Sequence, residues 1–158
     1  MPRFSANLSF LYPDRPFLDR FAAAAADGFT GVEYLFPYEY RAEEIAVRLH
    51  THGLQQAMFN LPPGDWATGE RGIACLPGRQ AEFAAGVTQA LRYAQVLDTR
   101  CLHVMAGIPK AGMSAAICHE TYLSNLRYAC ARAAELDRTV LIEPINTRDI
   151  PGYLLNRQ

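Results

Sequence analysis

The sequence predicts an α/β protein built on a sheet of parallel strands, and two patterns support this class. Short extended runs alternate with helical runs along the 158-residue chain, and no low-complexity linker separates them. Strands and helices that alternate at this rhythm form right-handed βαβ units, so the strands run parallel in one sheet. The helical runs also carry apolar residues at helical spacing, most clearly Phe83, Val87 and Leu91.

Strands are expected where short apolar runs are bounded by turn residues. They cover positions 4–10, 31–36, 54–61, 101–106 and 139–145. Helices are expected at 16–26, 41–51, 80–97 and 115–136. Gly28 and Gly53 end the first two helices, because glycine readily adopts the left-handed conformation that follows a helix C-terminus. Ser114 is the expected N-cap of the last helix, since its hydroxyl can accept a hydrogen bond from a free backbone N–H group.

Polar side chains on one face of the strands favour a barrel over an open sheet. Open parallel sheets are covered by helices on both faces and are apolar on both, whereas Ser5, Asn7 and Ser9 alternate with apolar residues. The same pattern recurs at Glu33, His103 and Glu143. The turn at 9–13 contains no glycine, which argues against a doubly wound nucleotide-binding sheet. We therefore predict a (β/α)₈ TIM-barrel type fold.

Length limits how much of that barrel the chain supplies. A complete barrel takes ~250 residues, so the 158 residues are expected to be truncated to about five βα units. Residues 1–158 are then a single incomplete TIM-barrel domain that contains the N-terminal five strands.

Composition restricts the partners. The net charge is −1, from 15 basic and 16 acidic residues, so no electrostatic field attracts nucleic acid or an anionic membrane. The longest apolar run, 21–26, is far shorter than the ~20 residues of a membrane span. The four cysteines form no CxxC pair and are expected to be buried free thiols in a reducing compartment. We expect a cytoplasmic protein that binds neither nucleic acid nor membrane.

Glu143 is the sharpest candidate for chemistry. It ends an apolar strand and precedes Pro144, at the carboxyl end where barrels collect their active-site residues. A carboxylate in such a place is costly to bury unless a metal, a cation or hydrogen bonds compensate. Two interpretations stay open, a catalytic or metal-binding glutamate and a structural glutamate paired with Arg71.

The segment at 60–72 is the second candidate, because loops this long in compact domains are usually functional. Trp66 can exclude water from a site, and Arg71 can bind a carboxylate with two parallel hydrogen bonds. The alternative is an ordered surface loop in which Glu70 and Arg71 are solvated. His103 can line the site or lie in the barrel core, and the core is favoured from sequence.

Seven motifs together resemble the hydroxypyruvate isomerase family, which lies within a larger group of xylose-isomerase-like barrels. Gly-Asp-Trp at 64–66 and Gly-Glu-Arg-Gly at 69–72 are specific to this family. A strand that ends in Glu-Pro, as at 143–144, occurs across the larger group. The motifs span the chain in the order 3–9, 28–33, 36–38, 60–62, 64–66, 69–74 and 141–146.

The resemblance implies an isomerase that interconverts hydroxypyruvate and tartronate semialdehyde, or acts on a related 2-oxo-tetronate. A divalent metal, Mg²⁺ or Mn²⁺, polarises the substrate oxygens in such barrels, and two glutamates transfer a proton through an enediolate. Glu143 matches the first glutamate, as metal ligand and as acid or base. Arg71 and Glu70 are the expected partners of the substrate carboxylate, and Trp66 and Asn7 complete the expected substrate-binding set.

The sequence departs from the family pattern by ending at Gln158. One carboxylate cannot hold a catalytic divalent ion, so the chain alone is expected to bind metal weakly and to show no turnover. Open parallel edges at its first and fifth strands are expected to favour homo-oligomers. The alternatives are a non-catalytic barrel fragment and another activity of the larger group, such as a sugar epimerase or an abasic-site endonuclease.

Overall fold

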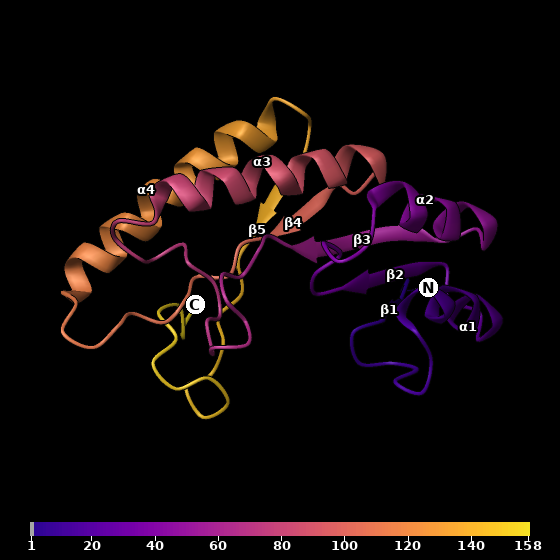
Figure 1. Cartoon of the computed structure of the whole chain (residues 1–158), viewed down its shortest axis with the longest axis horizontal. Helices are drawn as coiled ribbons and strands as arrows, with labels where there is room; N and C mark the ends of the chain where they lie inside the picture. The colour runs from indigo at the N-terminus through magenta and orange to yellow at the C-terminus, as the bar shows by residue number, and fades with distance from the viewer. Residues whose placement is uncertain (1) are drawn as a thin grey trace.

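A computed structural model describes residues 2–158 and contains five parallel strands in a single sheet (Figure 1). The strands lie side by side in the order in which they occur in the sequence, β1-β2-β3-β4-β5. Their bounds are β1 Ser5–Asn7, β2 Gly31–Tyr34, β3 Gln55–Asn60, β4 Cys101–His103 and β5 Thr139–Leu141. The predicted class is therefore confirmed: strands and helices alternate, the sheet is parallel, and the arrangement is that of a partial TIM barrel.

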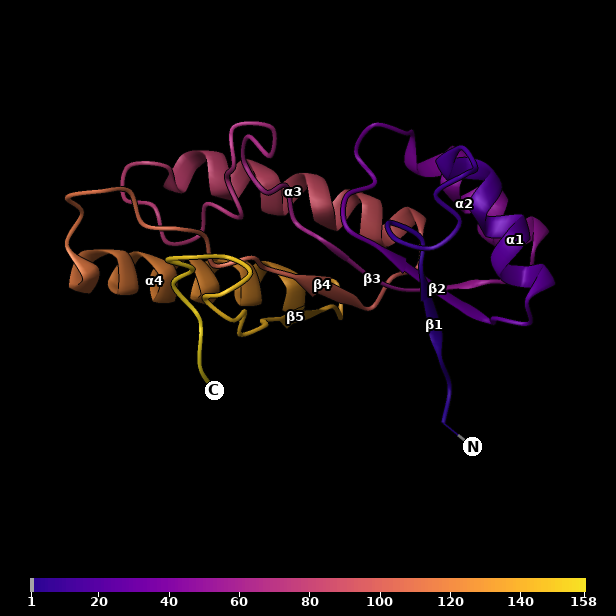
Figure 2. The same cartoon turned by 90° about the horizontal axis from the view of Figure 1, so that it is seen from below.

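Helices connect successive strands and cover one side of the sheet. They are the short 3₁₀ helix η1 Phe17–Asp19, and α1 Arg20–Ala26, α2 Ala42–Thr51, α3 Gln80–Val96 and α4 Ala115–Ala134. Figures 1 and 2 show α3 and α4 running along β3 to β5, with α1 and α2 at the β1 and β2 end. None of the described helices is long and apolar enough to cross a membrane.

The hydrophobic core lies between the helices and the outer face of the sheet. Tyr34, Phe59 and Leu102 come from neighbouring strands and are almost completely buried. Phe21 of α1 and Phe83 of α3 pack into the same core. Alternate strand residues point to opposite faces, so the partners Asn7, Glu33, Asn60 and His103 lie on the inner face.

The strands are shorter than predicted, and the hydrogen bonds show why. After β1 the chain turns at once, since the backbone N–H groups of Phe10 and Leu11 both donate to the carbonyl of Asn7. After β5, Pro144 has no N–H to continue a ladder. The N–H of Ile145 donates instead to Leu155 at 2.9 Å.

The segment after β5 folds back against the segment after β4. The Tyr153 hydroxyl accepts the backbone N–H of Ala106 at 2.7 Å, and the N–H of Leu154 donates to the carbonyl of Gly107 at 3.0 Å. All four cysteines are free. Cys75 and Cys118 are buried as expected, but Cys101 is only partly buried, and Cys130 is exposed because it lies on the solvent side of α4.

Candidate active site

A cavity of about 500 Å³ lies at the carboxyl ends of the strands. This is the end at which parallel α/β proteins bind their ligands. Apolar side chains such as Met58, Leu141 and Ile150 form much of its wall. Its polar lining consists of Asn7, Glu33, Asn60, His103 and Glu143.

Asn7 and Glu33 form one polar pair in this cavity. They are direct neighbours in the β1–β2 ladder, and the Asn7 Nδ2 donates to Glu33 Oε1 at 3.1 Å. The other end of the amide is held as well, because Asn7 Oδ1 accepts the N–H of Ser9 at 3.0 Å. The Asn7 side chain is therefore fixed in orientation at the end of β1.

Asn60 and His103 form a second pair, across β3 and β4. The side chains are only 2% and 4% exposed, and Asn60 Oδ1 lies 3.0 Å from His103 Nδ1. Burial lowers the pKa of His103 below its ordinary value of 6.5, and the Glu143 carboxylate opposes this only in part. The lowered pKa favours the neutral form of the imidazole.

Glu143 lies two residues beyond the end of β5 and lines the cavity from there. The two-residue spacing puts it on the same face as Leu141, which pairs with His103. Its carboxylate is exposed, and it forms no ion pair with the other residues of the 2–158 range. The alternative pairing with Arg71 is therefore not what the structure contains.

Trp66 and Arg71 are stacked in the long loop between β3 and α3. The Arg71 guanidinium carbon lies 3.7 Å from the centre of the Trp66 ring, and its Nη1 donates to the carbonyls of Trp66 and Glu70. Trp66 also packs edge-on against Phe36 at 5.1 Å and lines the cavity. Arg71 lines a different hollow, which it shares with Lys110.

The Glu70 carboxylate is bonded to other residues of the same loop. Its Oε2 accepts the backbone N–H of Asp65 at 2.7 Å, and its Oε1 forms a short ion pair with Arg79. Arg79 also binds both carboxylate oxygens of Glu82, at 2.6 and 2.7 Å. Glu70 does not line the strand-end cavity. The carboxylate thus links Asp65, in the first part of the loop, to Arg79 at its end.

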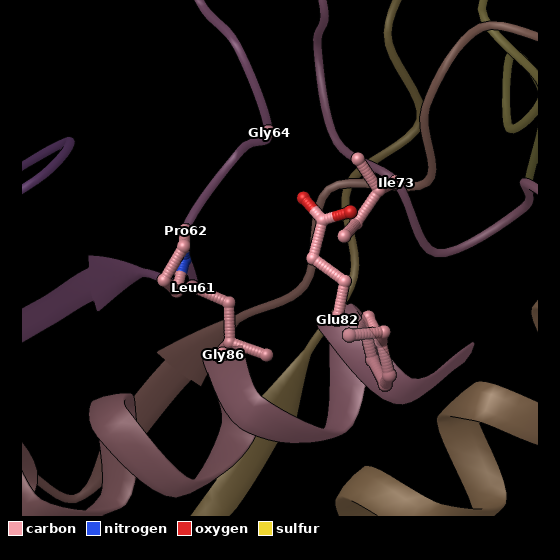
Figure 3. A pocket seen from close by; sticks show the side chains of 7 residues that line it. Leu61, Pro62, Gly64, Ile73, Glu82 and Gly86 are labelled. Carbon is pink, nitrogen blue, oxygen red and sulfur yellow. The ribbon is translucent and has the colours of Figure 1, made fainter. Parts of the chain in front are cut away.

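A smaller hollow lies behind this loop, between it and the start of α3 (Figure 3). Its volume is about 140 Å³, and Pro62 closes it against Gly86. Glu82 points into it toward Ile73 and Gly64 in Figure 3. Because both oxygens of Glu82 are bound to Arg79, its carboxylate belongs to the loop scaffold.

Substitution of Glu70 by glutamine is expected to lower the free energy of unfolding at pH 7 by about 1–3 kcal/mol. Burial of the Glu70 carboxyl raises its pKa, but the hydrogen bonds from Arg79 and Asp65 outweigh burial and leave it below 4.5. A depressed pKa contributes stability above the unfolded value, which is lost as pH falls through the folded one. The difference between wild type and Glu70→Gln, measured by urea unfolding, should therefore be constant above about pH 5 and shrink below 4.5.

Glu120→Gln is the matched control, because Glu120 is an exposed carboxylate on α4. Glu120→Gln should change the free energy of unfolding by less than about 0.5 kcal/mol both above about pH 5 and below 4.5. Equal effects of the two variants would contradict the structural role of Glu70.

The described residues do not by themselves form a metal site. Within 2–158, no three His, Cys, Asp or Glu side chains lie close enough together to hold an ion. Glu33 and Glu143 are the two carboxylates in the cavity, and Glu33 already accepts a hydrogen bond from Asn7. Catalytic divalent ions take several oxygen ligands, so Glu143 contributes at most one of them.

The structure brings Asn7, Trp66 and Glu143 together and leaves Glu70 and Arg71 outside the cavity. It adds Glu33 and His103, which the sequence marks as inward polar residues of their strands without a substrate role, and Asn60, the first residue of the 60–72 segment. Their signal was present in the sequence, because each is a polar residue on the inward face at or near the carboxyl end of its strand.

Comparison with known proteins agrees with the partial TIM-barrel fold. Residues 21–157 match the family model described as xylose isomerase-like TIM barrel. The chain is 60% identical over all 158 residues to the 2-oxo-tetronate isomerase of Cupriavidus necator, covering 61% of that protein. It is 50% identical to the hydroxypyruvate isomerase of Escherichia coli, over 98% of this chain and 60% of that protein. The chain thus spans about 60% of the length of these curated relatives.

Two solved structures also resemble the chain. The crystal structure of AP endonuclease, family 2, from Brucella melitensis matches with a TM-score of 0.95 at 52% identity, over 98% of this chain and 60% of that one. The Escherichia coli 3-keto-D-glucoside 4-epimerase matches at 18% identity and a TM-score of 0.66, over 92% of this chain and 57% of that one. The second likeness reflects the fold alone.

Proposed function

Because the chain belongs to the hydroxypyruvate isomerase and 2-oxo-tetronate isomerase family of xylose isomerase-like TIM barrels, we propose that its strand-end cavity binds a short 2-oxo acid for isomerisation. The observation that carries this proposal is the convergence of Asn7, Glu33, Asn60, His103 and Glu143 on one cavity at the carboxyl ends of the strands. The candidate substrates are hydroxypyruvate and 2-oxo-tetronate, the compounds in the names of the relatives.

Glu143 is the proposed acid or base. Isomerisation of hydroxypyruvate moves a proton from the hydroxyl-bearing carbon to the neighbouring carbonyl carbon through an enediolate. Glu143 has an exposed carboxylate that forms no ion pair within residues 2–158, so it is available for one of these transfers. Glu33 is the other carboxylate in the cavity, and its Oε1 is already bonded to Asn7.

The remaining expected site residues take different parts in this proposal. Asn7 orients the substrate from the end of β1, and Trp66 covers the cavity and excludes water. Arg71 remains the proposed partner of the substrate carboxylate; it lies outside the cavity, on the face of Trp66, which lines the cavity. Glu70 acts at a distance, by holding the loop that carries both.

A divalent metal belongs to the proposal for the family reaction, where Mg²⁺ or Mn²⁺ would polarise the substrate oxygens. The residues described here do not form its site, since no group of three ligating side chains occurs within 2–158. The incomplete five-stranded domain is therefore proposed to supply the substrate cavity and Glu143 only. A reducing cytoplasm is the proposed compartment and suits its four free cysteines.

Self-association of the 158-residue chain is expected through the outer edges of β1 and β5. Each of these strands pairs on one side only with a strand of the described region. Unpaired edges leave free N–H and C=O groups that bind another strand. Sedimentation equilibrium should therefore show dimers or larger species at micromolar concentration, and a clean monomer would contradict this expectation.

An endonuclease is the second candidate, since the Brucella protein that matches at 52% identity carries that name. A net charge of −1 gives no attraction to DNA, and the cavity has a mostly apolar wall that suits a small ligand. Cleavage of an abasic-site duplex by a protein that does not isomerise 2-oxo acids would favour this second candidate.

The proposed function is tested by a chimaera in which these 158 residues replace the matching 61% of the Cupriavidus necator enzyme. We expect it to isomerise hydroxypyruvate or 2-oxo-tetronate in the presence of Mg²⁺ or Mn²⁺. The 158-residue chain alone should show no turnover under the same conditions. A folded but inactive chimaera would refute the proposed function, and turnover by the chain alone would refute the argument from ligand number.

A further inference from the structure

His103 contains a buried nitrogen that the fold leaves unused. The side chain is 4% exposed and lines the strand-end cavity, and its Nε2 has no hydrogen-bond partner among the described residues. A buried nitrogen without a partner costs about 1–3 kcal/mol, so such groups need an explanation. The other ring nitrogen is bonded to Asn60, and the space that the His103 side chain lines is the cavity.

The bond to Asn60 determines what Nε2 can do. Asn60 Oδ1 only accepts hydrogen bonds, so His103 Nδ1 carries the hydrogen and Nε2 retains its lone pair. The Asn60 backbone is fixed at two points. Its carbonyl accepts the Tyr38 hydroxyl at 2.7 Å, and its N–H donates to the Leu35 carbonyl at 2.9 Å. The Nε2 lone pair of His103 is therefore a hydrogen-bond acceptor, on a ring whose partner Asn60 has a fixed backbone.

The rest of the cavity suggests the ligand. Neither lysine nor arginine is among the described residues that line it, and its polar atoms include the carboxylates of Glu33 and Glu143. Acceptors in such number fit a ligand that donates hydrogen bonds. A metal ion is a poorer fit for Nε2, because no three ligating side chains cluster within residues 2–158.

We propose that His103 Nε2 accepts the hydrogen bond of a hydroxyl group on the bound acid, so that the cavity selects hydroxy acids over their deoxy counterparts. This rests on the proposed function in one respect, since it takes the ligand to be the short 2-oxo or hydroxy acid. A buried acceptor that has no other partner penalises any ligand without the hydroxyl, because the acceptor then stays unpaired. His103 would thus determine specificity, while Glu143 carries the proton.

The first experiment reads the imidazole directly, by long-range ¹H–¹⁵N correlation spectra of the full chain labelled with ¹⁵N-histidine. His103 should be in the Nδ1–H form at pH 7.5, with an unprotonated Nε2. Glycolate should move the Nε2 resonance, and acetate, which lacks the hydroxyl, should not. A proton on Nε2, or an equal response or none to both acids, would overturn the proposal.

The second experiment measures the affinity of the full chain for both acids by isothermal titration calorimetry. Wild type should bind glycolate about tenfold more tightly than acetate, the effect of one additional hydrogen bond. The ratio should fall to about one in His103→Phe, whose ring keeps most of the volume, and stay at about ten in the exposed α4 variant His119→Gln. An unchanged ratio in His103→Phe would overturn the proposal. A failure of the proposed function would instead be seen in the earlier activity test, as a chimaera that folds but is inactive.

Discussion

Substitution of Glu143 by glutamine is expected to lower the turnover of hydroxypyruvate by the chimaera about 10²–10⁴-fold, the usual contribution of a positioned acid or base. Glutamine keeps the size of the side chain and its hydrogen-bonding oxygen but cannot accept a proton at neutral pH. The loss should appear in kcat, because a proton is transferred only in the chemical step. Steady-state kinetics of the chimaera at saturating substrate measure it.

The position of Glu143 allows an effect on catalysis to be separated from an effect on stability. The carboxylate is exposed and forms no ion pair with the described residues, so the free energy of unfolding should change by less than about 0.5 kcal/mol. Glu120→Gln on α4 removes a carboxylate far from the cavity and should leave kcat unchanged. Turnover of Glu143→Gln within threefold of the parent would remove Glu143 from the mechanism.

The largest effect on stability is expected for Gly72→Ala. Gly72 has a φ of +102°, and an added Cβ would lie 2.3 Å from the carbonyl oxygen of Met105 and 2.6 Å from its Cβ. The obstacle is backbone, which cannot move aside as a flexible side chain does. The loop would have to leave the segment after β4, and the free energy of unfolding should fall by about 4 kcal/mol.

Gly69→Ala separates this clash from the cost of the backbone conformation. Gly69 lies in the same loop with a φ of +95°, but no atom lies within 4 Å of its added Cβ. The free energy of unfolding of Gly69→Ala should fall by only about 1–2 kcal/mol, which is the cost of placing an alanine in the left-handed conformation. The free energies of unfolding of the two variants, measured in urea, should therefore differ by about 2–3 kcal/mol, and equal losses would show that the loop does not press against Met105.

Much of the fold could be predicted because it depends on local patterns. The order of strands and helices follows from the alternation of short apolar runs with helical periods, and α3 was predicted almost to its bounds for that reason. Parallel pairing follows from the connections alone. The ends of the strands could not be predicted, because they depend on hydrogen bonds between residues distant in sequence, such as that from Ile145 to Leu155.

The candidate site was predicted in part, for a related reason. Glu143 is recognisable as a carboxylate at the end of an apolar strand, and the structure places it in the cavity. Glu70 was expected beside a substrate, but it is bound by Arg79, nine residues away in an irregular loop. For His103 the sequence favoured the core over the site; the side chain is buried, and it also lines the cavity. Periodicity cannot separate these two conditions, because both place a residue on the inner face.

The order of the strands also bears on how the protein is made. Each strand after β1 pairs with the strand that precedes it in the sequence, so no later strand of the described sheet has to insert between two earlier ones. A chain leaving the ribosome can add each new strand to an edge that already exists. Contacts between units close in sequence also shorten the loops that must close at each step. The sheet can therefore grow in the direction of translation, with each finished unit serving as the template for the next.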